Sequence, residues 1–99
     1  MNKGFVYILT NEFMPGLIKI GRTESNPKAR ASQLFTTGVP GGFKIAEAVK
    51  TNDCKGLEAQ MHDWFAPVRV NSRREFFRHD AREAALILRV AAFSWGAPK

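Results

Sequence analysis

The chain has 99 residues, a formal net charge of +6, 44% hydrophobic and 11% aromatic residues. This apolar content excludes a disordered chain, and the length suits one small core, so we expect a single domain over residues 1–99. The one cysteine, Cys54, excludes an internal disulfide and is typical of a reducing compartment such as the cytoplasm.

Two short apolar runs come first, FVYIL at 5–9 and LIKIG at 17–21, and Met14-Pro15-Gly16 between them has the chemistry of a turn. They predict an antiparallel hairpin. Each run carries one ionisable side chain, Tyr7 and Lys19, where a plain hairpin core would have valine or isoleucine. If the runs pair across the turn, both groups can face the same side of the sheet.

A helix follows the hairpin, because Asn26 can cap a helix and Pro27 suits its first position; we expect it to continue to about Phe35. Residues 43–51 alternate well enough to predict a third strand. Asn52 or Asp53 then caps a second helix, whose apolar stripe is made of the following residues: Leu57, Met61, Trp64, Phe65 and Val68.

The last predicted helix covers residues 81–92, because Asp80 and Glu83 form a capping box. Residues 75–78 before it read as a short extended piece or a turn. The expected fold class is therefore α+β, a small three-stranded antiparallel sheet flanked by about three helices. No secretory leader is recognisable, and the longest apolar stretch, 84–93, is interrupted by Arg89 and too short for a bilayer, so no membrane association is expected.

Arginines concentrate late in the chain: six of the eight lie between positions 69 and 89. Arginine suits forked hydrogen bonding to phosphate oxygens, and Phe76 and Phe77 are interleaved with the charges. This distribution favours a nucleic-acid partner over the alternative, a charge that serves solubility alone. Glu75 is expected to hold one of the arginines, and one phenylalanine to lie in the core. The candidate basic rim consists of Arg69, Arg73, Arg74 and Arg78.

The pair FVY…KIG resembles the GIY-YIG signature of small nucleases, with Phe-Val-Tyr in place of Gly-Ile-Tyr and Lys-Ile-Gly in place of Tyr-Ile-Gly. Arg30 falls where that family has an arginine in its first helix, and Glu58 where it has a metal-binding glutamate. The longer pattern MPGLIKIGRT…RASQL…TGVP…LEAQMHDWF…REFFR is similar to the compact phage and bacterial branch of the superfamily, over residues 4–78.

This sequence also departs from the family pattern at three places. Lys19 replaces the second tyrosine, as in some restriction enzymes of the superfamily. Leu34 stands at the position of a frequent histidine, and the downstream asparagine has no clear counterpart, with Asn71 as one candidate.

The resemblance implies a metal-dependent DNA endonuclease in which Glu58 binds Mg²⁺ or Mn²⁺. It implies that Arg30 binds the nonbridging phosphate oxygens and that Tyr7 takes a proton from the attacking water. The ammonium of Lys19 would favour the phenolate of Tyr7, whose unperturbed pKa is near 10. Arg22 and His62 complete the candidate catalytic set, with Arg22 also a DNA contact.

Structural roles stay open beside these catalytic ones. Tyr7 alone could be an ordinary strand aromatic, and Glu58 a solvated helix residue paired with His62. The alternative function is a weakly active or inactive DNA-binding module of the same fold, or a subunit of a larger nucleic-acid-processing complex. Cutting both strands with one site per chain would favour a homodimer, which no residue of the sequence specifies.

Overall fold

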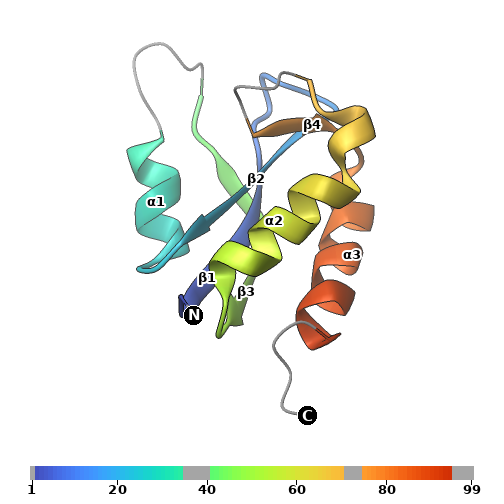
Figure 1. The fold of residues 1–99 in the computed structure, drawn as a ribbon. Coiled ribbons are helices and arrows are strands. Elements are labelled where there is room, and N and C mark those ends of the chain that lie inside the picture. The colour runs from blue at the N-terminus through green and yellow to red at the C-terminus, as the bar shows by residue number, and fades with distance from the viewer. Residues whose placement is uncertain (1, 35–40, 71–74, 95–99) are drawn as a thin grey trace.

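The computed structural model describes residues 2–34, 41–70 and 75–94, and within them it has a four-stranded antiparallel sheet with the order β3-β1-β2-β4 (Figure 1). The strands are β1 (Gly4–Thr10), β2 (Leu17–Thr23), β3 (Lys44–Thr51) and β4 (Phe76–Arg78). The helices are α1 (Pro27–Gln33), α2 (Cys54–Trp64) and α3 (Ala81–Ser94), with a 3-10 turn at Ala66–Val68.

The α+β class and the helices are as expected, but the prediction of three strands was wrong. Phe76–Arg78 pairs with β2 in the register Leu17 opposite Arg78 and Lys19 opposite Phe76. Three residues are too few to show the alternation that marks a strand in a sequence, so this strand is defined only by its distant partner.

The predicted hairpin is confirmed. Leu17 N donates to Met14 O at 3.2 Å, and Gly16 has φ +80°, as a type II turn requires at its third position. Tyr7 lies opposite Gly21, and Leu9 lies opposite Lys19. Since directly opposed residues share a face and side chains alternate along a strand, Tyr7 and Lys19 are on the same side of the sheet.

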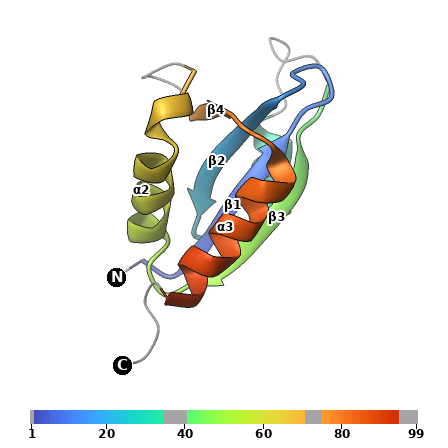
Figure 2. The same ribbon diagram turned by 90° about the vertical axis from the view of Figure 1, so that its right-hand side faces the viewer.

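Helices cover both faces of the sheet (Figures 1 and 2). On one face α1 packs on a small cluster that contains Tyr7, Leu9 and Ala31. On the other face α2 and α3 enclose the main core, which includes the buried side chains of Val6, Ile8, Ile18, Ile20, Leu57, Met61, Phe65, Phe77 and Leu88. Tyr7 is therefore separated from the main core by the thickness of the sheet.

Side-chain caps begin each helix where the sequence predicts. Asn26 Oδ1 accepts from Lys28 N at 2.8 Å, Asp53 Oδ1 from Gly56 N at 3.0 Å, and Asp80 Oδ2 from Glu83 N at 2.9 Å. α1 is described to Gln33 with Leu34 as its C-cap, and the expected end at Phe35 lies outside the described residues.

The predicted apolar stripe of α2 is wrong at two positions, because Val68 lies beyond the helix, in the 3-10 turn that packs on the core, and Trp64 points away from the core. Trp64 is 66% exposed, while Cys54, Leu57 and Met61 are buried. Trp64 lies at the margin of the stripe, over a groove between α2 and α3 that Leu86 and Val90 also line. No helix in the described part of the chain is both long and apolar enough to cross a membrane.

Strand β4 is short, and this positions the site. It pairs with β2 from Leu17 to Lys19, and Ile20 N then donates to Glu75 O at 3.1 Å. The remainder of β2, from Gly21 to Thr23, continues past the end of β4. Side chains from both faces of the sheet can meet around this edge.

Candidate active site

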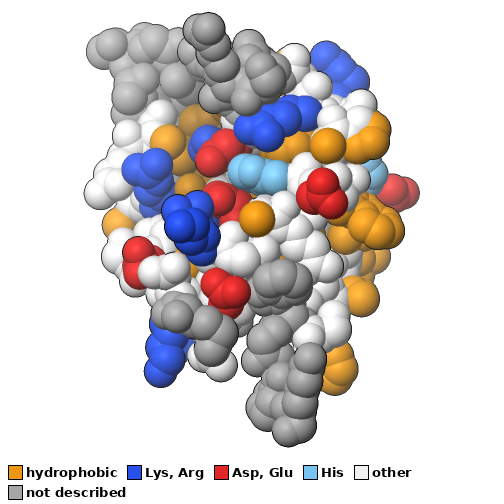
Figure 3. Space-filling model, viewed as in Figure 1, with side chains coloured by type: hydrophobic (Ala, Val, Ile, Leu, Met, Phe, Trp, Pro, Cys, Tyr) orange, Lys and Arg blue, Asp and Glu red, His pale blue; other side chains and the backbone are white. Residues whose placement is uncertain are grey.

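A polar cavity of about 400 Å³ lies at the end of β2. It is lined by Tyr7, Arg22, Thr23, Glu24, Arg30, Gln33, Glu58 and Glu75. Four of the six residues predicted to be catalytic are in this lining, and they come from β1, β2, α1 and α2. Acidic and basic side chains also gather beside a histidine on the face seen in Figure 3.

Gly21 lets the tyrosine reach this cavity. It lies directly opposite Tyr7 on the neighbouring strand. A Cβ atom at position 21 would lie 2.5 Å from Tyr7 Oη and 2.7 Å from Cζ, so the phenol occupies the space that a side chain would need. The last residue of the LIKIG run is therefore required by the packing of the tyrosine in the FVY run.

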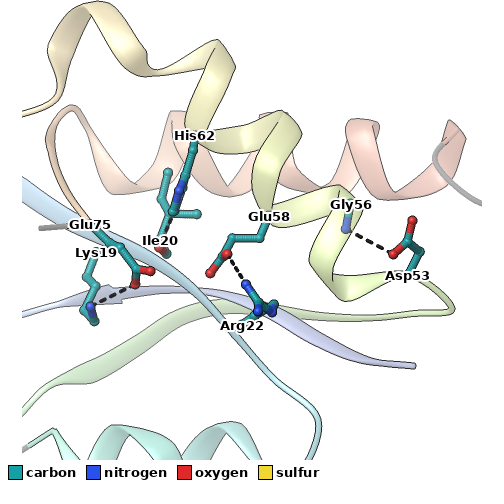
Figure 4. A network of polar contacts seen from close by, with 8 residues as sticks. All are labelled: Lys19, Ile20, Arg22, Asp53, Gly56, Glu58, His62 and Glu75. Atoms are coloured by element: carbon teal, nitrogen blue, oxygen red, sulfur yellow. Dashed lines mark hydrogen bonds and ion pairs between the residues drawn. The ribbon is translucent and has the colours of Figure 1, made fainter. Parts of the chain in front are cut away.

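Glu58 is held by an arginine from the sheet. It is 6% exposed, and its Oε1 accepts from Arg22 Nη1 at 2.6 Å (Figure 4). The hydrogen bond and the charge of Glu58 raise the pKa of the Arg22 guanidinium, which stays protonated. The alternative in which Glu58 is a solvated residue paired with His62 is wrong.

Lys19 does not serve the tyrosine in the expected way. Its Nζ bonds Glu75 Oε2 at 3.1 Å and lies 5.4 Å from the centre of the Phe76 ring. Glu75, which we expected to hold an arginine, is thus bound to a lysine 56 positions earlier. Sequence reasoning missed Glu75 as a site residue, because its only signal was an acid in an arginine-rich segment.

Arg30 instead is the cation that acts on Tyr7. Burial raises the pKa of the Tyr7 phenol above its ordinary value of 10.0, and the nearby carboxylates of Glu75 and Glu58 raise it further. A hydrogen bond and the positive charge of Arg30 lower that pKa, which opposes the effect of burial. The phenol is therefore neutral near pH 7, and Arg30 is positioned to favour its deprotonation.

Tyr7 is the one tyrosine of the chain, so ultraviolet absorbance of phenolate reports on it alone. We expect it to titrate above pH 10 in the folded protein and near 10 in denaturant, and Arg30→Gln to raise the folded value further. Because the folded pKa is raised, this group stabilises the fold fully below pH 10 and less as pH rises through the folded pKa. A Tyr7 pKa at or below 10 in the folded protein would contradict the conclusion that burial outweighs the effect of Arg30 on this phenol.

His62 is fixed by the backbone of β2. Its Nε2 is 2.8 Å from Ile20 O, and its ring packs 5.3 Å from that of Phe77. In Figure 4 the imidazole points from α2 toward the sheet, beside the carboxylates of Glu58 and Glu75. One ligand atom from each of these three residues lies within 4.8 Å of the others. Carboxylate oxygens and an imidazole nitrogen are suitable ligands for a divalent cation, so the residues present fit the metal that the resemblance implies.

The predicted basic rim is partly described. Arg78 is exposed on β4, and the guanidinium of Arg69 lies 5.4 Å from the ring of the buried Phe77. Arg73 and Arg74, like Asn71, lie outside the described residues. Phe77 is the core phenylalanine that was expected, and Phe76 stacks on Phe43 at 6.2 Å.

Fold and cavity together define a small α+β domain with paired acidic and basic groups at a sheet edge. The T5orf172 domain family matches residues 4–92, so the chain belongs to this family, whose nuclease-like fold is related to that of the GIY-YIG nucleases. The GIY-YIG family itself gives no direct match. No curated protein and no solved structure matches the chain.

Proposed function

We propose that this protein is a metal-dependent DNA endonuclease that hydrolyses phosphodiester bonds through a GIY-YIG-type site. One observation carries the proposal: Tyr7, Arg22, Arg30 and Glu58 line a single polar cavity in a domain of a nuclease-like family. Phosphodiester hydrolysis needs a proton acceptor, donors to the phosphoryl oxygens and a carboxylate for a cation. These four side chains supply all three.

Arg30 binds the nonbridging oxygens of the scissile phosphate. Its guanidinium is permanently charged and offers a fork of donors, and no shift of its protonation is needed during the reaction. The same group lowers the pKa of the Tyr7 phenol against the effect of burial. In this role Arg30 replaces Lys19 as the cation that prepares Tyr7 to accept a proton from the attacking water.

Glu58 would hold the metal, and Mg²⁺ or Mn²⁺ bound there supplies charge stabilisation at the phosphoryl group and a more acidic water. Arg22 keeps the Glu58 carboxylate oriented, since the two are hydrogen-bonded at 2.6 Å. Arg22 also lines the cavity that the phosphate would occupy, so it can contact the bound DNA. The exposed Arg78 contributes to the approach of the DNA, by charge and not by contact with the reacting phosphate.

A plasmid-nicking assay with Mg²⁺ and Mn²⁺ tests the function. We expect wild type to nick supercoiled plasmid only when the metal is present, and Glu58→Gln to remove that metal-dependent nicking. Nicking is a suitable readout because a monomer and a homodimer can both produce it. If wild type and Glu58→Gln show equal background nicking, the proposed enzyme activity is wrong.

A DNA-binding module without turnover is the second candidate. It is favoured by the pairing of two of the three carboxylates in the cavity lining with basic side chains, Glu58 with Arg22 and Glu75 with Lys19. Such pairs can serve structure alone. Salt-dependent DNA binding without any metal-dependent cleavage would support this candidate, and absence of binding at low salt would exclude both.

A further inference from the structure

We propose that Glu58, His62 and Glu75 together form a divalent-cation site, and that Lys19 competes with the cation for Glu75. This inference deepens the proposed function by adding two ligands to Glu58 and by naming the class of metal. Its starting point is geometric: one ligand atom from each of the three residues lies within 4.8 Å of the others, at the side of β2 that faces α2 (Figure 4).

The two carboxylates are brought together by different parts of the fold. Glu58 projects from α2, while Glu75 comes directly before β4, and its backbone oxygen accepts from Ile20 N at 3.1 Å. Two carboxylates so close together repel each other unless a positive charge lies between or beside them. Here Arg22 and Lys19 provide one positive charge for each carboxylate.

A divalent cation carries the same total charge as that arginine and lysine together. In its presence the carboxylates no longer need both basic side chains, and Lys19 in particular becomes free for a phosphate oxygen. Lys19 is mostly buried, with 12% of its side chain exposed, so its ammonium stays beside Glu75 as long as no cation is bound. Lys19 and the metal therefore compete for Glu75.

The ligand chemistry of His62 indicates which class of metal the site prefers. A carbonyl oxygen can only accept, so His62 Nε2–H donates a hydrogen bond to Ile20 O, and the tautomer that makes this bond has its lone pair on Nδ1. Histidine ligands of metals usually donate their second N–H to a carbonyl or carboxylate in this manner. An imidazole nitrogen favours transition metals over Mg²⁺ and Ca²⁺, which prefer oxygen, and Mn²⁺ is the transition metal that also suits the two carboxylates.

The test breaks the Lys19–Glu75 ion pair from either end. Without DNA, Mn²⁺ is titrated into the full chain, and free Mn²⁺ is followed by electron paramagnetic resonance. Glu75→Gln removes a ligand and should weaken Mn²⁺ binding by about tenfold or more. Lys19→Gln removes the competing charge and should tighten binding by roughly threefold to tenfold. Both variants lose the same ion pair, so a purely structural role would shift the affinity in the same direction in both.

Two controls accompany the titration. Glu83→Gln removes an exposed glutamate on α3 and should leave Mn²⁺ affinity unchanged. Circular dichroism identifies any variant that fails to fold, and in that event Glu75→Asp, which keeps the charge on a shorter side chain, replaces Glu75→Gln and should weaken binding to a smaller extent.

The inference is overturned if wild type binds no Mn²⁺, if Glu75→Gln binds as wild type does, or if Lys19→Gln weakens binding. These outcomes are separate from the fate of the nuclease activity. A chain that nicks plasmid while Glu75→Gln keeps full Mn²⁺ affinity rejects the three-residue site alone. A chain that shows the predicted opposite shifts but does not nick rejects the nuclease alone.

Discussion

Arg30→Ala should lower the single-turnover rate of DNA cleavage by about 10³–10⁵-fold, the loss typical of an arginine that stabilises a transferring phosphoryl group. The prediction rests on the place of Arg30 in the polar cavity and on its interaction with the Tyr7 phenol. Removing the guanidinium leaves the developing phosphoryl charge without its fork of donors, and it also leaves burial to raise the pKa of Tyr7 unopposed. DNA affinity should fall only slightly.

Arg78→Ala is the matched control, because Arg78 is an exposed arginine on the short strand β4. It should weaken DNA binding, more so at low salt, and leave the rate at saturating enzyme unchanged. Arg30→Lys keeps the charge without the fork and should recover only part of the rate. Quenched-flow cleavage at saturating enzyme gives the chemical step alone. Wild-type rates for Arg30→Ala under those conditions would show that Arg30 is not at the phosphoryl group.

Local signals in the sequence were sufficient for most of the fold. The Met14-Pro15-Gly16 turn sets the hairpin, and Asn26, Asp53 and Asp80 cap the helices through contacts to residues two or three positions away. Such contacts depend on neighbours along the chain and are therefore readable from it. Strand β4 was predicted only as a short extended piece or a turn, because its place in the sheet depends on pairing with β2, far away in the sequence.

The site shows the same difference between what local sequence signals predict and what depends on distant segments. Tyr7, Arg30 and Glu58 fall on positions that the GIY-YIG resemblance marks, and all three line the cavity. Arg22, which directly follows the second motif, lines it too, whereas Lys19, which the resemblance also marks, is not in the lining. The partner of Lys19 could not be predicted in this way. Periodicity indicates which face of a strand a lysine occupies, but not which of several acids across the sheet edge will reach it. Glu75 was assigned to an arginine because arginines are its neighbours in sequence.

Gly21→Ala should lower the free energy of unfolding by about 1–3 kcal/mol, the usual cost of overpacking a filled site. The added Cβ would lie 2.5 Å from Tyr7 Oη and 2.8 Å from Cε1, and Tyr7 is only 1% exposed. A rigid, buried ring cannot rotate away from such a contact as the end of a flexible chain would. For a domain of this size each kcal/mol lowers the melting temperature by about 4–8 °C, which calorimetry resolves.

Gly21→Ala should also lower the rate of DNA cleavage, because it displaces the Tyr7 phenol. If Tyr7 moves out of the cavity, cleavage loses its proton acceptor, a contribution of about 10²–10⁴-fold. Its absorbance titration should shift toward pH 10 as the ring becomes hydrated. A double-mutant cycle isolates the cause: in a Tyr7→Leu background, Gly21→Ala should cost clearly less stability than in wild type. Additive costs would mean that the glycine serves the backbone of β2 instead of the tyrosine, and that the phenol reaches the cavity for another reason.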